Sequence, residues 1–461
     1  MGECERMNVA KFGGSSLADA GQIKKVASII TADTDRKIIV VSAPGKRSDE
    51  DTKVTDLLIH LGETALAGKD TADALQNVVE RFRSITEELG LSEDMLRIIE
   101  KDLQERVDYT KESPERFLDQ MKAAGEDNNA KVIASYLQSQ GVLSEYINPA
   151  EAGLYVSDTP GNAQVLPESY DNLYKLRERK GILIFPGFFG YSKEGKLVTF
   201  SRGGSDITGS IVAAGIKADL YENFTDVDSV FAANPKVVKD PVAIKRMTYR
   251  EMRELSYAGF AVFHDEALIP AFQKSIPVCV KNTNNPKTSG TMIISEREYA
   301  LNPVIGIAAD KGFSTLYVRK YLMNREVGFG RRLLSIIEDE GISYEHIPSG
   351  IDDTSVILDN SQLTPAAEEK IINRITKELE ADDVYFEKGL AMIMLVGEGM
   401  HETVGIAARA TKALMEKEIN IEMINQGSSE VSLAFGIKEE QVDDAIRGLY
   451  EEFFSTKEVL Q

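Results

Sequence analysis

The chain has 461 residues, enough for roughly two to four domains, and its 43% hydrophobic and 28% charged content is typical of soluble globular proteins. With 53 Lys and Arg against 74 Asp and Glu, the net charge of −21 argues against a general binder of nucleic acid or of anionic membranes. Two cysteines and four scattered histidines are too few for a disulfide framework or a thiolate or histidine metal site. No stretch is apolar enough to cross a bilayer and no signal peptide is evident, so we expect a cytoplasmic protein.

The first predicted element is a strand at residues 7–12, MNVAKF, which runs into the glycine turn KFGGSS at Lys11–Ser16 and then into an amphipathic helix. Ser16 and Asp19 stand at capping-box spacing for that helix. Two glycines at a strand-to-helix turn let backbone N–H groups approach an anion, and a helix N-terminus favours negative charge. The same residues also fit a tight turn with a serine cap, so this stretch alone leaves both alternatives open.

Further apolar runs predict buried strands that alternate with helices. They lie at residues 37–43, 181–190, 219–231 and 275–283, with a hairpin at 191–200. Residues 54–141 are mostly helical, with expected breaks near Gly90 and Gly125. This alternation predicts an α/β fold with a mainly parallel central sheet sandwiched by helices. A ligand of such a sheet binds at the carboxyl ends of the strands, where KFGGSS and a second glycine turn, SRGGSDIT, both fall.

The pattern changes after about Leu301, beyond the boundary stretch NPKTSG. A strand, a helix and two further strands are predicted within residues 304–358, and a similar order recurs within 389–454. Two related α+β units of modest length therefore form an internal repeat.

Three charged side chains near the predicted strand ends could serve a ligand. Lys11 supplies a point charge for phosphate oxygens, and Arg202 supplies a planar fork for a substrate carboxylate. Glu126 could receive a substrate ammonium, although a solvated surface residue is the alternative for it. Arg202 is harder to explain by packing, because the two glycines beside it give no packing reason to hold an arginine there.

Four smaller polar side chains lie at the same turns. Ser42 follows a strand, Thr55 lies near a helix start, and Ser205 and Asp206 open the helix after the second glycine turn. Ser42 and Thr55 are more often helix caps than ligands, and Asp206 could simply complement the dipole of its helix.

Four stretches together resemble the aspartokinases: KFGGSS, SRGGSDIT after GFFG, FTDVDSV, and INIEMINQGSSEVSLAF. The resemblance runs along nearly the whole chain. Single motifs are shared with other amino-acid kinases, such as glutamate or acetylglutamate kinases, whereas the paired C-terminal units and the stretch Asn425–Glu430 favour aspartokinase. The resemblance implies an amino-acid kinase domain at 1–300 and ferredoxin-like ACT domains at 301–385 and 386–461, with a strand from 301–312 as a candidate to complete the last one.

The resemblance also implies roles for residues of this sequence. Lys11 and Asp206 would be catalytic, with Lys11 on the transferring phosphoryl group. Aspartate would be held by Ser42, Thr55, Glu126, Arg202, Gly203, Gly204 and Ser205, with Glu126 on its ammonium and Arg202 on its α-carboxylate. ATP would be bound by Lys11, Gly13, Gly14, Ser15, Thr225, Asp226, Phe231 and Lys236. Mg²⁺ would be carried by the ATP phosphates, with no metal ligand from the protein.

Two departures from the family pattern concern the nucleotide. The lysine that the family usually carries near the nucleotide is Ala261 here, and the loop at 230–236 reads VFAANPK where a tyrosine and Asp-Pro-Arg are more usual. ATP would then bind more weakly or be held partly by other groups, such as Lys236 or Arg246.

The C-terminal half resembles an amino-acid sensor. The expected effector residues are Val327, Gly328, Phe329, Ser343, Tyr344, Glu345 and Ser349. Glu345 would receive a lysine ammonium, with an exposed strand glutamate as the alternative. Pairing between ACT domains would make the protein a homodimer, and dimers could pair into a tetramer.

The activity that the resemblance implies is Mg-ATP-dependent phosphorylation of the side-chain carboxylate of L-aspartate, the first step toward lysine, threonine and methionine, with feedback by lysine, threonine or both. An aspartate side chain has a pKa of ~3.9, so it is already an anionic nucleophile at neutral pH. The alternatives are a related kinase with another carboxylate substrate, such as glutamate, and a non-catalytic amino-acid sensor in which Ala261 marks a decayed nucleotide site.

Overall fold

The computed structural model describes residues 6–201, 203–260, 266–298, 303–427, 429 and 431–455. The chain forms two compact units. The first unit comprises Met1–Val230, Ala243–Tyr249 and Val262–Arg297, and the second comprises Phe231–Val242, Arg250–Ala261 and Glu298–Gln461. Within the described part of the chain, no helix is both long and apolar enough to span a bilayer.

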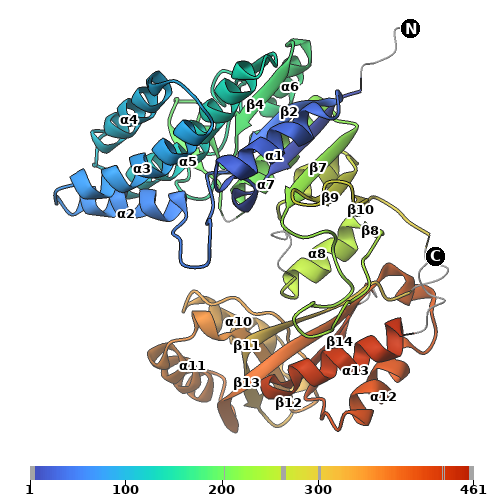
Figure 1. The fold of residues 1–461 in the computed structure, drawn as a ribbon. Coiled ribbons are helices and arrows are strands. Elements are labelled where there is room, and N and C mark those ends of the chain that lie inside the picture. The colour runs from blue at the N-terminus through green and yellow to red at the C-terminus, as the bar shows by residue number, and fades with distance from the viewer. Residues whose placement is uncertain are drawn as a thin grey trace. The chain divides into compact units, whose positions relative to one another are not determined.

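An eight-stranded sheet forms the centre of the first unit (Figure 1). Its order is β3 (Ser144–Tyr146), β4 (Ile182–Pro186), β2 (Arg36–Val41), β1 (Asn8–Phe12), β7 (Leu220–Thr225), β9 (Val278–Asn282), β10 (Thr291–Ile294) and β8 (Arg246–Thr248). All neighbouring strands are parallel except β9 and β10, which are antiparallel. The predicted mainly parallel α/β sheet is therefore confirmed. The predicted hairpin is present too, as β5 (Phe189–Tyr191) and β6 (Leu197–Thr199).

Helices cover both faces of this sheet. One face packs against α1 (Ala20–Thr31) and α5 (Pro114–Ser139). Helices α2 (Val54–Leu66), α3 (Ala72–Glu88) and α4 (Glu93–Val107) pack against these helices and one another, and all five share one hydrophobic core with the strands. The other helices of the first unit are α6 (Glu168–Tyr174), α7 (Gly204–Ile216) and α9 (Ile269–Gln273), while α8 (Tyr249–Tyr257) begins in this unit and continues into the second. Because side chains alternate along a strand, Ala10 and Phe12 of β1 enter the core beside α1–α5, whereas Lys11 points to the face that carries α7.

Two local predictions were wrong. The N-cap of α1 is Asp19, whose side chain accepts a hydrogen bond from the Gln22 N–H at 2.8 Å, whereas Ser16 lies in a separate 3-10 turn and bonds Thr283. Gly125 does not break the helical region but lies inside the 26-residue helix α5. It is a packing position, because a Cβ there would lie 2.7 Å from Cβ of Ala43.

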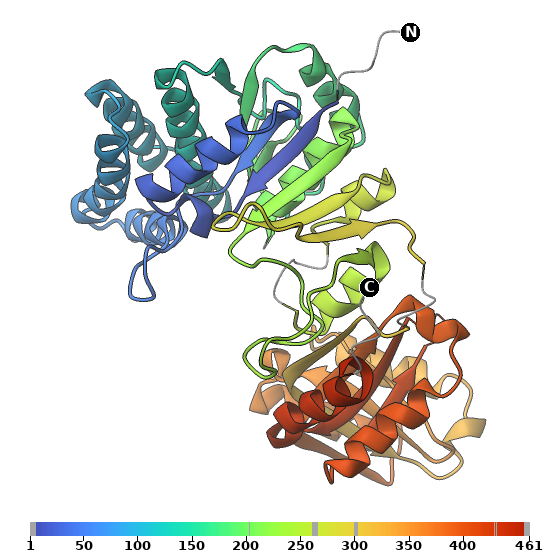
Figure 2. The ribbon, with the colours of Figure 1, turned by 45° about the vertical axis from the view of Figure 1, so that its right-hand side comes forward.

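The second unit contains a five-stranded antiparallel sheet. Its order is β12 (Asp353–Asp359), β11 (Gly306–Arg319), β13 (Asp383–Val396), β15 (Ser432–Lys438) and β14 (Met423–Gln426). Its helices are α10 (Phe329–Glu338), α11 (Pro365–Glu378), α12 (Ile406–Glu416) and α13 (Val442–Phe454). Helices α12 and α13 lie side by side over this sheet (Figures 1 and 2).

The long strands β11 and β13 pair with each other; β12 of the first half of the predicted repeat pairs with β11, and β15 of the second half pairs with β13. A single sheet therefore joins the two halves. The predicted boundary between residues 385 and 386 falls inside β13, and the division into three domains stays a prediction. A strand was expected within residues 341–349, but only isolated bridges form there, between His346 and Ile357 and between Ser349 and Thr354. Pro348, which has no N–H to donate, interrupts that ladder.

Candidate active site

The centre of the candidate site is an ion pair between β1 and α7. Lys11 is 6% exposed, and its Nζ lies 2.6 Å from Oδ1 of Asp206, in the first turn of α7. A charged ammonium is costly to bury without a partner, and Asp206 supplies that partner. The structure thus brings together the two residues predicted to be catalytic.

The turn after β1 approaches the turn after β2 very closely. The Gly45 N–H donates to the Gly14 carbonyl at 2.9 Å, and a Cβ at Gly45 would lie only 2.7 Å from that oxygen and 2.8 Å from the Ser15 nitrogen. The Gly13 N–H already donates to the Phe224 carbonyl at 3.1 Å. Gly14 and Ser15 begin a 3-10 turn, where N–H groups lack intrahelical partners, and they are therefore the better candidates for contacts to phosphate.

Arg81 of α3 holds the loop that contains Gly45. Its guanidinium donates to the Gly45 carbonyl at 2.8 Å and pairs with Asp51. Arg81 is buried, and its charge is compensated by the Gly45 carbonyl and the Asp51 carboxylate of the same loop. Neither Gly45 nor Arg81 was predicted from the sequence, because both lie outside the four stretches that carry the family resemblance.

Glu126 is buried rather than solvated, with 5% exposure. Burial raises the pKa of its carboxyl to about 8, while hydrogen bonds from the Ala43 N–H and from Ser205, and the charge of Lys11, act in the opposite direction. One carboxylate oxygen, Oε2, has no protein partner. The alternative of a surface glutamate is therefore wrong, and the site contains a buried acceptor that a ligand cation could satisfy.

Ser42 and Thr55 lie near the same edge of the sheet. Ser42 follows β2, its N–H donates to the Phe12 carbonyl at 3.2 Å, and its own carbonyl accepts from Nδ2 of Asn129 at 2.7 Å. Thr55 is the second residue of α2 and is half-buried. The N-cap of α2 is Lys53, so neither hydroxyl caps that helix.

The second glycine turn shapes the start of α7. Gly203 has φ +75°, a conformation that L side chains rarely adopt, and its carbonyl accepts the Asp206 N–H at 2.8 Å. Gly204 and Ser205 are buried, and Ser205 packs against Gly187, where a Cβ would lie 2.7 Å from the serine Oγ. Arg202 lies outside the described residues.

The predicted nucleotide residues fall in both units. In the first unit, Oγ1 of Thr225 donates to Asp226 at 3.1 Å, and Nδ2 of Asn282 donates to the Asp226 carbonyl at 3.2 Å. In the second unit, Phe231 is half-buried and Lys236 is exposed. Ala261 lies outside the described residues, as do the next four positions.

The predicted effector residues all lie in the second unit. Val327 is 97% exposed, Gly328 is the N-cap of α10 with φ +79°, and Phe329 is buried. Ser343 bonds Gln362 through both its N–H and its hydroxyl. The remaining positions are Tyr344 and Ser349, both exposed, and Glu345, half-buried.

Glu345 lines a small cavity of about 180 Å³ in the second unit. Its carboxylate accepts a hydrogen bond from the Tyr257 hydroxyl at the end of α8. The neighbouring His346 is held through Nδ1 by the Asn425 amide at 2.8 Å, and burial lowers the pKa of this histidine. Phe313, Met392 and Met394 add an apolar surface.

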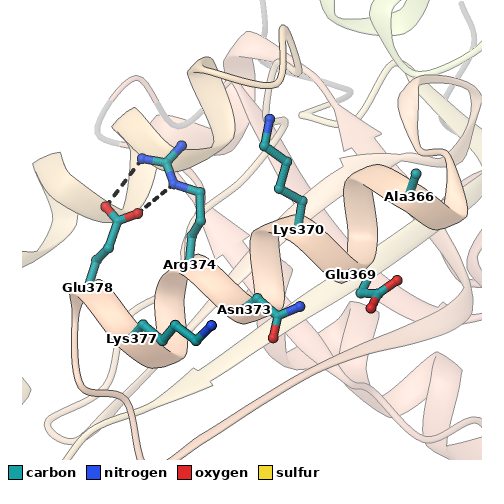
Figure 3. Close-up of a pocket in the computed structure, with 7 residues that line it drawn as sticks. All are labelled: Ala366, Glu369, Lys370, Asn373, Arg374, Lys377 and Glu378. Atoms are coloured by element: carbon teal, nitrogen blue, oxygen red, sulfur yellow. Dashed lines mark hydrogen bonds and ion pairs between the residues drawn. The ribbon is translucent and has the colours of Figure 1, made fainter.

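A different hollow, of about 420 Å³, lies along α11 (Figure 3). All its side chains come from that single helix, and Arg374 is bound to Glu378 at 2.7 and 3.2 Å and to Asp339 at 2.8 Å. It therefore has the character of a charged helix surface, and we assign it no ligand.

Comparison with known proteins decides the family. Residues 6–282 match the amino acid kinase family, and residues 393–453 match an ACT domain. Aspartokinase 3 of Bacillus subtilis (strain 168) is 58% identical over 449 residues, which cover 97% of this chain and 99% of that protein. The chain belongs to the aspartokinases. Aspartokinases are kinases that act on aspartate, so the chain is an enzyme of that class.

Solved aspartokinase structures agree with this. Clostridium acetobutylicum aspartate kinase superimposes with a TM-score of 0.87 and 38% identity, covering 97% of this chain and 100% of that one. Escherichia coli aspartokinase III, in complex with aspartate and ADP, has a TM-score of 0.79 and 23% identity over 97% of this chain and 100% of its own. Its complex with lysine and aspartate has a TM-score of 0.74 at 23% identity, covering 97% and 99%. At this identity the E. coli protein shows the shared fold alone.

Proposed function

We propose that this aspartokinase transfers the γ-phosphoryl group of ATP to the side-chain carboxylate of L-aspartate, producing 4-phospho-L-aspartate, at the ion pair of Lys11 and Asp206. The observation that carries the proposal is the buried Lys11 ammonium, 2.6 Å from Asp206, beside two glycine turns and a buried carboxyl. The E. coli enzyme in complex with aspartate and ADP supports the choice of substrates.

Aspartate would bind between α5 and the start of α7. Its ammonium would satisfy Oε2 of Glu126, and ionising that carboxyl in a buried site is favourable only with a cation beside it. Ser205, already bonded to Glu126, would contact the same substrate. The further proposed contacts are Ser42, Thr55, Arg202, Gly203 and Gly204.

The nucleotide would lie with its phosphates at the turn after β1, against Lys11, Gly13, Gly14 and Ser15. Its remaining proposed contacts are Thr225, Asp226, Phe231 and Lys236. We propose that Mg²⁺ arrives on the ATP phosphates, with no ligand from the protein. When bound there, Mg²⁺ neutralises phosphate charge.

The chemistry requires two anions to meet. A carboxylate oxygen of aspartate forms the new bond to the γ-phosphorus as the bond to the bridging oxygen breaks and ADP leaves with that electron pair. No proton is removed, so the protein needs no general base. Asp206 holds the Lys11 ammonium in place. That ammonium offsets the repulsion between the aspartate carboxylate and the ATP phosphates and stabilises the charge on the transferring phosphoryl group. The net charge of −21 opposes this weakly, because exposed charges are screened within about 8–10 Å.

The test is ADP release measured by a coupled assay with Mg-ATP and aspartate, glutamate or no acceptor. The proposal predicts ADP release that depends on aspartate, with an acyl phosphate that hydroxylamine traps. Release with glutamate instead would indicate a kinase for another carboxylate, and no acceptor-dependent release would contradict the proposal.

For regulation, we propose feedback by an end product, lysine, threonine or both, at the predicted first ACT domain, residues 301–385. The E. coli complex with lysine and the ACT match support an amino-acid effector. The proposed contacts are Val327, Gly328, Phe329, Ser343, Tyr344, Glu345 and Ser349. A lysine ammonium at Glu345 would compete with the Tyr257 hydroxyl for that carboxylate. Effector binding would thereby release the end of α8.

We propose that this reaction is the first step of lysine, threonine and methionine formation. The proposed assembly is a homodimer through the ACT domains, with pairing of dimers into a tetramer as a further step. The cytoplasmic location expected from the sequence stays a prediction.

A further inference from the structure

Asn223 is a polar residue inside the sheet that none of the sequence motifs explains. It lies on β7, is 2% exposed, and donates through Nδ2 to Oδ1 of Asp206 at 2.5 Å. The same nitrogen donates to the Tyr221 hydroxyl at 3.2 Å. That hydroxyl in turn donates to the Asp206 main-chain carbonyl at 3.2 Å. Alternate residues of one strand therefore hold both the backbone and the carboxylate of Asp206.

The donor and the acceptor of each hydrogen bond in this network can be assigned from the chemistry of the groups. Both neighbours of the Asn223 amide nitrogen are oxygens, and one is a carboxylate that can only accept. A flipped amide would place its carbonyl oxygen against the Asp206 carboxylate, which is repulsive. Burial raises the pKa of Tyr221 well above 10, with the charge of Asp206 acting in the same direction, so the hydroxyl keeps its proton and remains a donor. Each group in this hydrogen-bonded network is therefore either the donor or the acceptor toward a given neighbour, and the assignment has no alternative.

Asp206 Oδ1 receives two donors of different kinds, the Lys11 ammonium and the Asn223 amide. Lys11 has a long flexible side chain, whereas Asn223 is short and fixed by two hydrogen bonds on a central strand. The Asn223 amide therefore fixes the position of the Asp206 carboxylate, and this carboxylate fixes the position of the Lys11 ammonium. Without the amide, Asp206 could turn about its side-chain bonds and carry Lys11 with it.

We propose that Asn223 is a positioning residue for phosphoryl transfer, holding the Asp206 carboxylate, and through it the Lys11 ammonium, in the orientation that the reaction requires. The inference rests on the proposed roles of Lys11 and Asp206. Asn223 touches neither substrate; it acts through Asp206. Since the ammonium must face the transferring group, its misplacement lowers turnover more than it lowers ground-state binding.

The test replaces Asn223 by leucine, which keeps the shape and removes the donor. We expect kcat of Asn223→Leu to fall about 10- to 100-fold, with KM for aspartate and for ATP within about threefold of wild type. The matched control is Asn128→Leu, because Asn128 is equally buried and donates to the carboxylate of Asp102 at 2.8 Å. The control should lose similar thermal stability and keep kcat within about twofold. Equal kcat in the two variants would overturn the inference.

Asp206→Asn separates this inference from the proposed function. If Asp206→Asn keeps normal turnover, the proposed catalytic site is wrong. If it loses turnover, then adding Asn223→Leu should cause less than about twofold further loss, because both changes act on one unit. If the kcat loss of the double variant instead equals the product of the two single-variant losses, Asn223 acts independently of Asp206 and the inference is overturned.

Asn223→Asp provides a second variant of nearly unchanged volume, should the leucine variant fold poorly. An ionised carboxyl there would repel Asp206, whereas a protonated one could donate to it. We therefore expect kcat of this variant, relative to wild type, to recover as the pH is lowered from 8 to 6. A relative kcat that does not change with pH would contradict the positioning role.

Discussion

Lys11 on β1 and Asp206 at the start of α7 form an ion pair with 2.6 Å between Nζ and Oδ1, in a part of the first unit where both side chains are largely shielded from water. The alternation of β1 explains why the pair exists: Ala10 and Phe12 enter the hydrophobic core on one face, so Lys11 must point to the other, where α7 begins. Asp206 is the partner of this buried cation in the structure, and in the proposed reaction the same ammonium also faces the transferring phosphoryl group.

Replacing Lys11 by methionine should leave the fold intact and remove the cation from the proposed phosphate site. We expect kcat to fall about 100- to 1000-fold, the loss typical of one electrostatic contact to a transition state. Coupled ADP release measures the activity, and circular dichroism with the melting temperature controls for folding. Near-normal turnover would exclude Lys11 from the chemistry.

Glu126→Gln should change the pH dependence of stability. The folded protein keeps the Glu126 proton up to about pH 8, whereas the unfolded chain loses it near the ordinary pKa of 4.5. Between these values the folded state holds more protons, so stability falls as the pH rises. Without ligands, the variant should therefore gain melting temperature over wild type as the pH goes from 5 to 8. A difference that does not change over this range would contradict the buried, protonated carboxyl.

The same residue should govern the pH dependence of aspartate binding. Because an ammonium binds the ionised carboxyl, KM for aspartate should fall in the wild type as the pH rises from 6 toward about 8. In Glu126→Gln the KM should be higher and nearly independent of pH over that range. An identical pH profile in both proteins would place the substrate ammonium elsewhere.

Gly45→Ala tests the close approach of the turns after β1 and β2. The added Cβ would lie 2.7 Å from the Gly14 carbonyl oxygen and must push the turns apart. We expect a loss of about 1–3 kcal/mol in the free energy of unfolding and an increase in KM for ATP. The matched control is Gly330→Ala in α10, where a Cβ meets nothing within 4 Å and alanine should stabilise by about 0.5–1 kcal/mol. Equal stability of the two variants, measured by urea unfolding, would show that the turns are not in contact.

Tyr257→Phe and Glu345→Gln separate the two partners of the proposed effector site. If an effector ammonium must displace the Tyr257 hydroxyl from Glu345, the phenylalanine variant should be inhibited at a lower effector concentration. Glu345→Gln should lose inhibition by a cationic effector while keeping kcat. Titration of lysine and threonine, separately and together, measures both. Unchanged inhibition in both variants would remove this pair from effector binding.

The sequence predicted the parallel sheet and both glycine turns at its strand ends because those features leave local signals: apolar runs of strand length, and glycines at strand-to-helix junctions. Residues whose importance depends on packing were mistaken or missed. Gly125 was predicted as a helix break, whereas it lies inside α5, at a position where Ala43 leaves no room for a side chain.

Asn223 was missed for a related reason. A single polar residue in an apolar strand gives no periodic signal, and its value depends on Asp206, which is remote in sequence. Arg81 was missed similarly, because nothing local to α3 reveals that its guanidinium holds the carbonyl of Gly45. Arg202 and Ala261, by contrast, were selected by motif, and both lie outside the described residues.

The measurement that tests the central claim most directly is a crystal structure of the protein grown with ADP, Mg²⁺ and aspartate. The account predicts the terminal phosphate of ADP beside the turn after β1, the aspartate ammonium within about 3 Å of the Glu126 carboxylate, and the Lys11 ammonium facing the gap between the two ligands. Aspartate or nucleotide bound at a place where Lys11 cannot reach that gap would contradict it.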